Sequence, residues 1–176
     1  MNKYAIQTHL ASVLEPYQSS FKDTSYDKEN KEHLCSDAQT NPVYDFDQYA
    51  KTLPADKHPA SPDAIYLGKK TLYFVEFKNS SPSTINNPQM QKKFKDGTNI
   101  LTDLLKTFAP KDVRYVFCVV YKQQKAQYFN PAHIESQTVK FGLAEINREL
   151  GNFYDEIITE DVDFYKKAYS SALSCT

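Results

Sequence analysis

Two carboxylates and a lysine lie at the ends of two apolar runs in the segment SPDAIYLGKKTLYFVEFKNS, residues 61–80. Asp63 precedes the first run, and Glu76 and Lys78 end the second. Because successive side chains of a strand point to opposite faces, Glu76 and Lys78 are predicted to share one face. The pattern therefore predicts a β-hairpin that carries its acidic and basic side chains at one end.

The register of this hairpin determines what the two carboxylates can do. If the two lysines of GKK form a two-residue turn, Leu67 pairs with Leu72, and by the same register Asp63 falls opposite Glu76. Cross-strand neighbours have Cβ atoms about 5 Å apart, a separation at which two carboxylates can bind one hard cation. Without a cation the carboxylates would repel each other. A Mg²⁺ ion held this way polarises a phosphoryl oxygen, and a neighbouring lysine can orient water or offset negative charge.

A simpler interpretation is that these residues form a solvated salt bridge at the edge of a sheet, which contributes only ~0 to 1 kcal/mol. The surrounding letters LYFVEF are apolar enough for the interior of a protein. A carboxylate in such a place must be paired or coordinated, because desolvating an ion costs several kcal/mol. The context therefore favours a metal site over a surface ion pair.

The rest of the chain predicts the elements that must position this hairpin. At 176 residues, with 40% hydrophobic residues, residues 1–176 are expected to form one folded domain. Residues 19–41 are polar and fit either a helix–loop insertion or a mobile excursion, and VYDFDQY fits a short strand. Helices are predicted at 2–18, 89–108, 139–150 and 161–173, and strands at 64–67, 71–78, 113–122 and 126–130.

Composition excludes several classes of protein. Lys and Arg (21) nearly balance Asp and Glu (22), so a nucleic-acid partner would need a local basic patch. Cys35, Cys118 and Cys175 show neither a disulfide framework nor zinc-site spacing, which favours a reducing compartment. No apolar stretch approaches the ~20 residues of a membrane helix, and MNKYAIQTHL lacks the apolar run of a signal peptide. We therefore expect a cytoplasmic protein without a membrane partner.

The letters PD at 62–63 and EFK at 76–78, placed on a predicted hairpin, resemble the motif of the PD-(D/E)XK nuclease superfamily. The resemblance extends to the local context. A helix at 89–108 and an apolar strand at 113–122 follow the hairpin, as in the αβββαβ core of that superfamily.

This resemblance covers residues 2–129, which leaves residues 130–176 as a C-terminal helical addition. The fold class that it implies is an α/β domain with a central mixed β-sheet flanked by helices. Its core would be restriction-endonuclease-like, with extra C-terminal helices.

The resemblance implies a Mg²⁺- or Mn²⁺-dependent phosphodiesterase, more an endonuclease than an exonuclease. It implies that Asp63, Glu76 and Lys78 are the catalytic residues. Asp63 and Glu76 would be metal ligands, and the backbone carbonyl of Phe77 would complete the metal site. Lys78 would be the catalytic lysine.

Some members of the superfamily add further residues to this set. One addition is an acidic ligand from the first helix, for which Glu15 is the candidate here, with Glu29 and Glu32 as alternatives if that helix lies later. Viral cap-snatching endonucleases place a histidine ahead of the motif, and His33 is the candidate for this role.

Basic residues near the hairpin are predicted to contact phosphates, since lysine suits backbone contact. A solvated face is the alternative for the run QKKFK. Some exonuclease-like relatives also place a glutamine on the helix after the motif. The predicted nucleic-acid contacts are Lys69, Lys70, Gln91, Lys92, Lys93 and Lys95.

The expected partner is nucleic acid, with DNA favoured over RNA by its frequency in the superfamily. An RNA endonuclease of cap-snatching type is the first alternative. The second is a catalytically inactive interaction module that keeps the nuclease fold, as an effector or immunity-type protein. The sequence leaves open whether the chain forms a homodimer or binds a protein partner.

Overall fold

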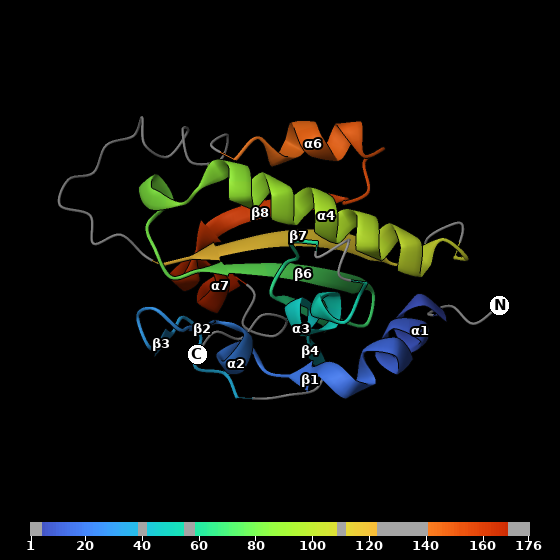
Figure 1. The fold of residues 1–176 in the computed structure, drawn as a ribbon, viewed down its shortest axis with the longest axis horizontal. Helices are drawn as coiled ribbons and strands as arrows, with labels where there is room; N and C mark the ends of the chain where they lie inside the picture. Colours follow the sequence, from blue (N-terminus) through green and yellow to red (C-terminus); the bar gives the residue numbers. More distant parts are fainter. Residues whose placement is uncertain (1–4, 39–41, 55–58, 109–111, 123–140, 169–176) are drawn as a thin grey trace.

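A six-stranded mixed β-sheet runs through the computed structural model, which describes residues 5–38, 42–54, 59–108, 112–122 and 141–168 (Figure 1). The described elements are α1 (Ala5–Leu14), η1 (Glu15–Tyr17), β1 (Gln18–Ser19), α2 (Phe21–Thr24), β2 (Tyr26–Asp27), β3 (Glu32–His33), β4 (Val43–Asp45), α3 (Phe46–Lys51), β5 (Ala64–Leu67), β6 (Thr71–Lys78), η3 (Pro82–Thr84), α4 (Asn87–Leu105), β7 (Arg114–Tyr121), α6 (Leu143–Glu149), β8 (Glu156–Asp161) and α7 (Val162–Ala168). The protein is therefore a mixed α/β fold with helices flanking one central sheet.

The strands of the central sheet follow the order β1-β4-β5-β6-β7-β8. The first four of these strands pair antiparallel, whereas β6, β7 and β8 run parallel to one another. Strands β2 and β3 form a separate two-stranded sheet, the β2–β3 hairpin. The chain thus changes from antiparallel to parallel pairing at β6, the strand that ends in Lys78.

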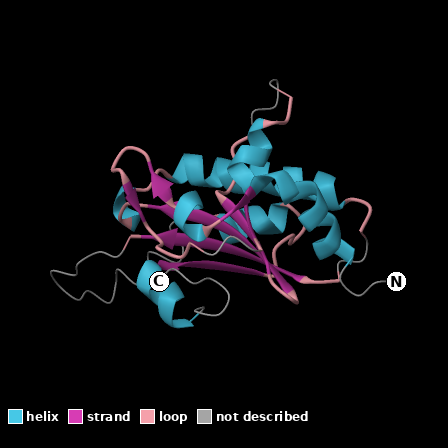
Figure 2. Ribbon diagram, turned by 90° about the horizontal axis from the view of Figure 1, so that it is seen from below, coloured by secondary structure: helices cyan, strands magenta, loops and turns pink. Residues whose placement is uncertain are grey.

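Helices cover both faces of the sheet (Figure 2). On one face, buried residues of α1, α3, α4 and α6 pack with Leu72 and Phe74 of β6. On the other face, residues of α2 and α7 pack with Val75 and Phe77 of the same strand. Strand β7 is buried on both faces as well, as expected of a parallel strand covered on each side.

Helix α4 begins at a capped end and packs lengthwise on the sheet. The Asn86 side chain accepts a hydrogen bond from the Gln89 backbone N–H at 3.0 Å, which satisfies one of the free donors of the first turn. Its buried side chains recur at three- and four-residue spacing, which gives the helix an apolar face. The buried positions are Met90, Phe94, Gly97, Thr98, Ile100, Leu101 and Leu105.

The predicted hairpin is confirmed, with strands at the expected residues and Leu67 paired with Leu72. The apolar strand after it is β7, and the helix between them is α4. The first helix ends at Leu14, where a 3-10 turn containing Pro16 follows. These elements were predictable because each has a clear apolar period and a clear end signal.

Two regions differ from the sequence prediction. In VYDFDQY only Val43–Asp45 is a strand, because the Asp45 side chain accepts a hydrogen bond from Gln48 N–H at 2.8 Å and begins α3. The C-terminal third is not only helical, since β8 at Glu156–Asp161 adds a sixth strand. Ile158 is its one buried residue, so β8 lacks the apolar pattern that marks an inner strand. The strand predicted at 126–130 lies outside the described residues.

None of the described helices is long and apolar enough to cross a membrane.

The described cysteines differ in state: Cys118 is a buried free thiol, whereas Cys35 is disulfide-bonded. Sequence spacing alone could not predict this bond, since a disulfide depends on which residues the fold brings together. The cysteine argument for a reducing compartment therefore no longer holds.

Candidate functional site

The end of the β5–β6 hairpin brings Asp63 and Glu76 together. Ala64 pairs with Val75, so Asp63, one residue earlier, lies beside Glu76. The backbone N–H of Phe77 donates a hydrogen bond to Oδ2 of Asp63 at 2.7 Å. The N–H and C=O of one strand residue point to the same edge, so the carbonyl of Phe77 also faces the side where Asp63 lies.

Glu76 is wholly buried, on the face of the sheet that α4 covers. Its Oε1 atom lies 2.7 Å from Nζ of Lys78, two residues along the same strand. The side chain of Lys78 keeps 19% of its surface exposed. The predicted common face of these two residues therefore produces a close ion pair at the end of β6.

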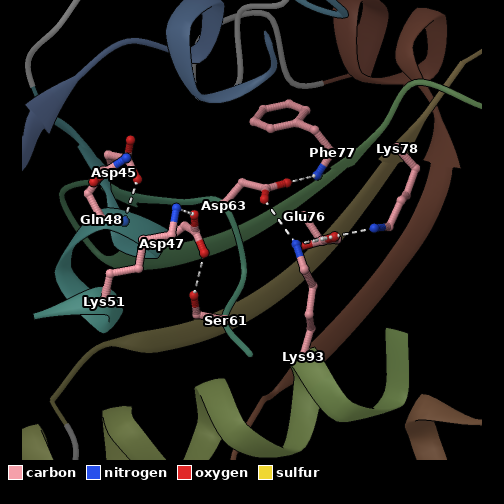
Figure 3. Close-up of polar contacts among 10 residues, drawn as sticks. All are labelled: Asp45, Asp47, Gln48, Lys51, Ser61, Asp63, Glu76, Phe77, Lys78 and Lys93. Carbon is pink, nitrogen blue, oxygen red and sulfur yellow. Dashed lines mark hydrogen bonds and ion pairs between the residues drawn. The ribbon is translucent and has the colours of Figure 1, made fainter. Parts of the chain in front are cut away.

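A second lysine, Lys93 of α4, joins both carboxylates (Figure 3). Its Nζ atom lies 3.1 Å from Oδ1 of Asp63 and 3.0 Å from Oε2 of Glu76. The ammonium group thus stands between the carboxylates, where the sequence analysis placed a metal cation. Asp63, Glu76, Lys78 and Lys93 are named the charged cluster below.

Sequence reasoning assigned Lys93 to a phosphate-binding run and missed its place beside the carboxylates. The signal was available in the helical period. Lys93 is three residues after Met90 and four before Gly97, both of which are buried, whereas Lys92 is turned to solvent. A lysine on the apolar face of a helix needs a buried anionic partner.

The electrostatics of the charged cluster follow from its burial. The pKa of Asp63 is raised to about 7. Burial is the largest cause, and the nearby charge of Glu76 is the second. Burial alone would lower the pKa of Lys93, but the charges of Asp63 and Glu76 outweigh it and raise that pKa. Lys93 therefore stays protonated at neutral pH and supplies the positive charge that the two carboxylates need.

The donor set of the cluster fits a divalent cation. Oε1 of Glu76 is buried and lies 2.7 and 2.9 Å from the ammonium nitrogens of Lys78 and Lys93, so a cation bound there would replace ammonium groups as the partner of this oxygen. Mg²⁺ is commonly bound by one or two carboxylates together with several water molecules. Asp63, Glu76 and the Phe77 carbonyl can supply such a set.

A polar cavity of about 330 Å³ opens on the charged cluster. Its lining includes Asp63, Lys78 and Lys93 of the charged cluster and residues of the segment that contains the β2–β3 hairpin. The remaining lining residues are Thr24, Ser25, Tyr26, Asp27, Glu29, Asn30, Phe77, Asn79 and Ser80. The polar stretch that the sequence left open thus forms half of the candidate site.

Gly97 allows α4 to pack closely on the loop that carries Asp63. A Cβ atom at Gly97 would lie 2.5 Å from Cδ of Pro62, the residue before Asp63. That distance is far below van der Waals contact, and a proline ring cannot move aside by rotation. The glycine that weakens the helical pattern is therefore explained by the approach of α4 to the site.

We expect Gly97→Ala to destabilise the protein by about 1–3 kcal/mol, the usual effect of overpacking. Without the clash, alanine would stabilise the helix by ~1 kcal/mol relative to glycine. The sign of the change in unfolding free energy therefore tests the close approach. Urea unfolding of the purified variant measures it. A variant more stable than the parent would show that α4 does not need this close approach.

The turn lysines lie away from the charged cluster. Lys69 and Lys70 are exposed at the opposite end of β6. Glu76 follows Lys70 by six residues along the strand, about 20 Å at ~3.3 Å per residue. These lysines do not line the cavity, so the structure does not bring them together with the carboxylates.

The other predicted contacts on α4 point elsewhere. Gln91 donates a hydrogen bond from its Nε2 atom to the backbone carbonyl of Phe141 at 3.0 Å. Lys92 pairs with Asp96 of the next turn at 3.3 Å, with 63% of its side chain exposed. Lys95 lies 3.7 Å from Glu149 of α6, also at the surface. Lys92 and Lys95 are therefore surface residues, whereas Lys93 is turned toward the carboxylates.

The candidate additional ligands do not join the two carboxylates. Glu15 is exposed at the start of η1, and the described residues contain no group of three or more His, Cys, Asp or Glu side chains placed to hold a metal. Glu32 forms an ion pair with Lys122 instead. Of the three acidic candidates, only Glu29 lines the cavity.

His33, on which the cap-snatching alternative depends, also lies outside this cavity. Its Nδ1 atom is 2.7 Å from the backbone carbonyl of Lys22, and its ring packs on Tyr26. The structure therefore places no described histidine beside the charged cluster.

Comparison with known proteins gives no match: no family model, no curated protein and no solved structure is found to be similar to this chain.

Proposed function

We propose that the protein is a metal-dependent nuclease that hydrolyses phosphodiester bonds, with DNA favoured over RNA as the substrate. The observation that carries the proposal is the convergence of Asp63 and Glu76 on one cationic position, beside Lys78 and at the wall of a polar cavity. Such an arrangement suits a hard cation with oxygen ligands and an adjacent ammonium.

The order of elements supports this proposal. Helix α1, the antiparallel strands β4, β5 and β6, helix α4 and the parallel strand β7 occur in the order αβββαβ, with η1, β1, α2, β2 and β3 inserted before β4, α3 before β5 and η3 before α4. Asp63 directly precedes the second strand of this series, and Glu76 and Lys78 lie on the third. This is the arrangement that the resemblance to the PD-(D/E)XK superfamily implies for a restriction-endonuclease-like core.

Each residue has a role in the proposed chemistry. Asp63, Glu76 and the Phe77 carbonyl would hold Mg²⁺ or Mn²⁺, which polarises a phosphoryl oxygen and lowers the pKa of bound water. Lys78 is the more exposed of the two lysines. Its ammonium can orient the attacking water or offset the negative charge that develops on the phosphate.

The charge of the cavity supports a requirement for metal. Its described lining contains the acidic residues Asp27, Glu29 and Asp63, and the basic residues Lys78 and Lys93. An anionic phosphate would therefore meet a slight excess of negative charge. A divalent cation reverses that excess, so substrate binding as well as chemistry should depend on it.

The test is a cleavage assay with supercoiled plasmid, linear duplex DNA, single-stranded DNA and single-stranded RNA, each with Mn²⁺ and with EDTA. The proposal expects products from at least one substrate with Mn²⁺ and none with EDTA. Cleavage that persists in EDTA, or no cleavage of any substrate, would contradict it.

A second candidate function is an interaction module that keeps the fold without cleaving. It is favoured by Lys93, because two carboxylates and two ammonium groups already balance in charge. Calorimetric titration with Mn²⁺ separates the two candidates. The nuclease should show a binding site that Glu76→Gln removes, whereas the module should show none.

Lys93 should compete with the metal for the two carboxylates. We expect Lys93→Met to raise Mn²⁺ affinity about tenfold or more, since no ammonium then has to be displaced. In EDTA the same variant should lose roughly 1–3 kcal/mol of stability, because buried carboxylates lose a partner. Calorimetry and urea unfolding measure the two effects.

The matched control for this pair of measurements is Lys92→Met, the exposed neighbour on the same helix. It should change neither quantity. Weaker metal binding by Lys93→Met would mean that Lys93 supports the metal site and does not compete with it.

A further inference from the structure

Tyr26 is an exposed aromatic residue in the lining of the cavity beside the charged cluster. Among the described residues, Tyr26 and Phe164 are the large hydrophobic side chains that are exposed, at 42% and 37%. Tyr26 lines the cavity together with Lys78 and Lys93, and Phe164 does not. An exposed aromatic residue therefore borders the space where a substrate of the proposed nuclease would lie.

The ring of Tyr26 is held in place by the β2–β3 hairpin. Tyr26 pairs with His33 in the ladder, and their rings pack with centroids 4.7 Å apart. The turn is closed by Asp27, whose Oδ1 atom accepts hydrogen bonds from the backbone N–H groups of Glu29 and Asn30 at 2.8 and 3.2 Å. Little conformational freedom remains to be lost when a ligand packs on the exposed part of the ring.

The hairpin is also anchored to the strands that carry the site. Asn79, next to Lys78, donates a hydrogen bond to Oε1 of Glu32 at 2.8 Å. Lys122, which follows β7, pairs with the same carboxylate. The β2–β3 hairpin, which carries Tyr26, is therefore fixed relative to the charged cluster by contacts at the end of the sheet.

A cavity lined by both charged groups and an aromatic residue matches one nucleotide unit. A phosphate suits the cationic side of the cavity once a metal is present, and the face of a base suits a tyrosine ring. The cavity volume, about 330 Å³, lies near the lower limit of small-molecule sites. A base within a duplex has both faces covered by its neighbours, so only an unpaired or extruded base can pack on Tyr26.

We propose that Tyr26 is the stacking platform for one unpaired base, and that the substrate is therefore single-stranded nucleic acid. This inference rests on the proposed function, because it needs a phosphodiester at the charged cluster. It also accounts for the chain's nearly balanced charge. Stacking adds affinity without phosphate neutralisation, whereas binding to a duplex depends largely on that neutralisation.

The test compares Tyr26→Ala with the parent in binding to two fluorescent strands of equal length. One strand is oligothymidylate, and the other is an abasic strand with the same phosphates but no bases. Ca²⁺ replaces Mg²⁺ to hold the cation site, and gels monitor strand integrity. Tyr26→Ala should bind oligothymidylate about 5- to 150-fold more weakly, and the abasic strand as well as the parent does.

Three control variants sharpen this result. Tyr26→Phe and Tyr26→Trp should retain affinity for oligothymidylate, because both keep an aromatic face. Phe164→Ala removes the other exposed aromatic ring and should change nothing. An RNA strand should respond to Tyr26→Ala as the DNA strand does, since every base has a face to stack.

The outcomes separate this inference from the proposed function. If the parent neither binds nor cleaves any strand, the proposed function fails. If the parent cleaves and Tyr26→Ala binds oligothymidylate equally well, only the role of Tyr26 is overturned. The role is also overturned if Tyr26→Ala weakens binding to the abasic strand, or to a duplex, as much as to oligothymidylate.

Discussion

Glu76→Gln and Asp63→Asn are each expected to lower metal-dependent cleavage at least about 1000-fold, which corresponds to ~4 kcal/mol of transition-state stabilisation. Each amide keeps the size of the side chain but offers a metal one neutral oxygen in place of a carboxylate. Single-turnover cleavage with Mn²⁺ measures the loss. Glu145→Gln, on the exposed surface of α6, is the matched control and should cleave like the parent.

The same variants test whether the carboxylates act in chemistry or only in folding. From the sequence, removal of either carboxylate should relieve repulsion. The structure changes that expectation, because Lys93 pairs with both groups and loses a partner in either variant. Circular dichroism should still show a folded protein at the assay temperature. A well-folded Glu76→Gln variant that cleaves at the parental rate would refute the proposed metal site.

Lys78→Ala should lower the cleavage rate about 100-fold or more while metal binding is retained. The variant keeps Asp63 and Glu76, so the cation ligands remain. It loses one preorganised electrostatic contact, typically worth ~3 kcal/mol in a transition state. Calorimetry with Mn²⁺ should therefore show that metal binding is retained. Single-turnover cleavage by the same preparation should show the slower rate. Lys51→Ala, an exposed lysine of α3, serves as the control.

Lys78→Arg should restore little of this activity. A guanidinium keeps the charge but is larger and planar, and it cannot give up its proton near neutral pH. If Lys78→Ala cleaves normally and Asp63→Asn does not, the metal site stands and the lysine takes no part. The basic residue of the reaction would then be sought at Lys93.

The β5–β6 hairpin shows what the sequence could predict. Its strands, its register and the meeting of Asp63 with Glu76 follow from a period of two and a short turn. These are local properties, because every residue involved lies within one contiguous segment. The neighbouring strand β7 was predictable for a related reason, since its continuous apolar run marks a strand covered on both faces.

Contacts across the fold could not be predicted in this way. The helical period marks Lys93 as a position on the apolar face of α4, but the carboxylates that it contacts depend on how α4 packs over the end of β6. Tyr26 lies in a polar stretch without a clear period, so neither its hairpin nor its place at the cavity was visible. Strand β8 was missed because this edge strand, with one buried residue, lacks the apolar run of an inner strand.

The most direct measurement is single-turnover cleavage of a labelled single-stranded oligonucleotide with Mn²⁺, by the parent and by Glu76→Gln. The proposed nuclease predicts cleavage by the parent, complete suppression by EDTA, and at least about a 1000-fold slower rate for the variant. Equal rates for the two proteins, or an oligonucleotide left intact by the folded and metal-loaded parent, would contradict it.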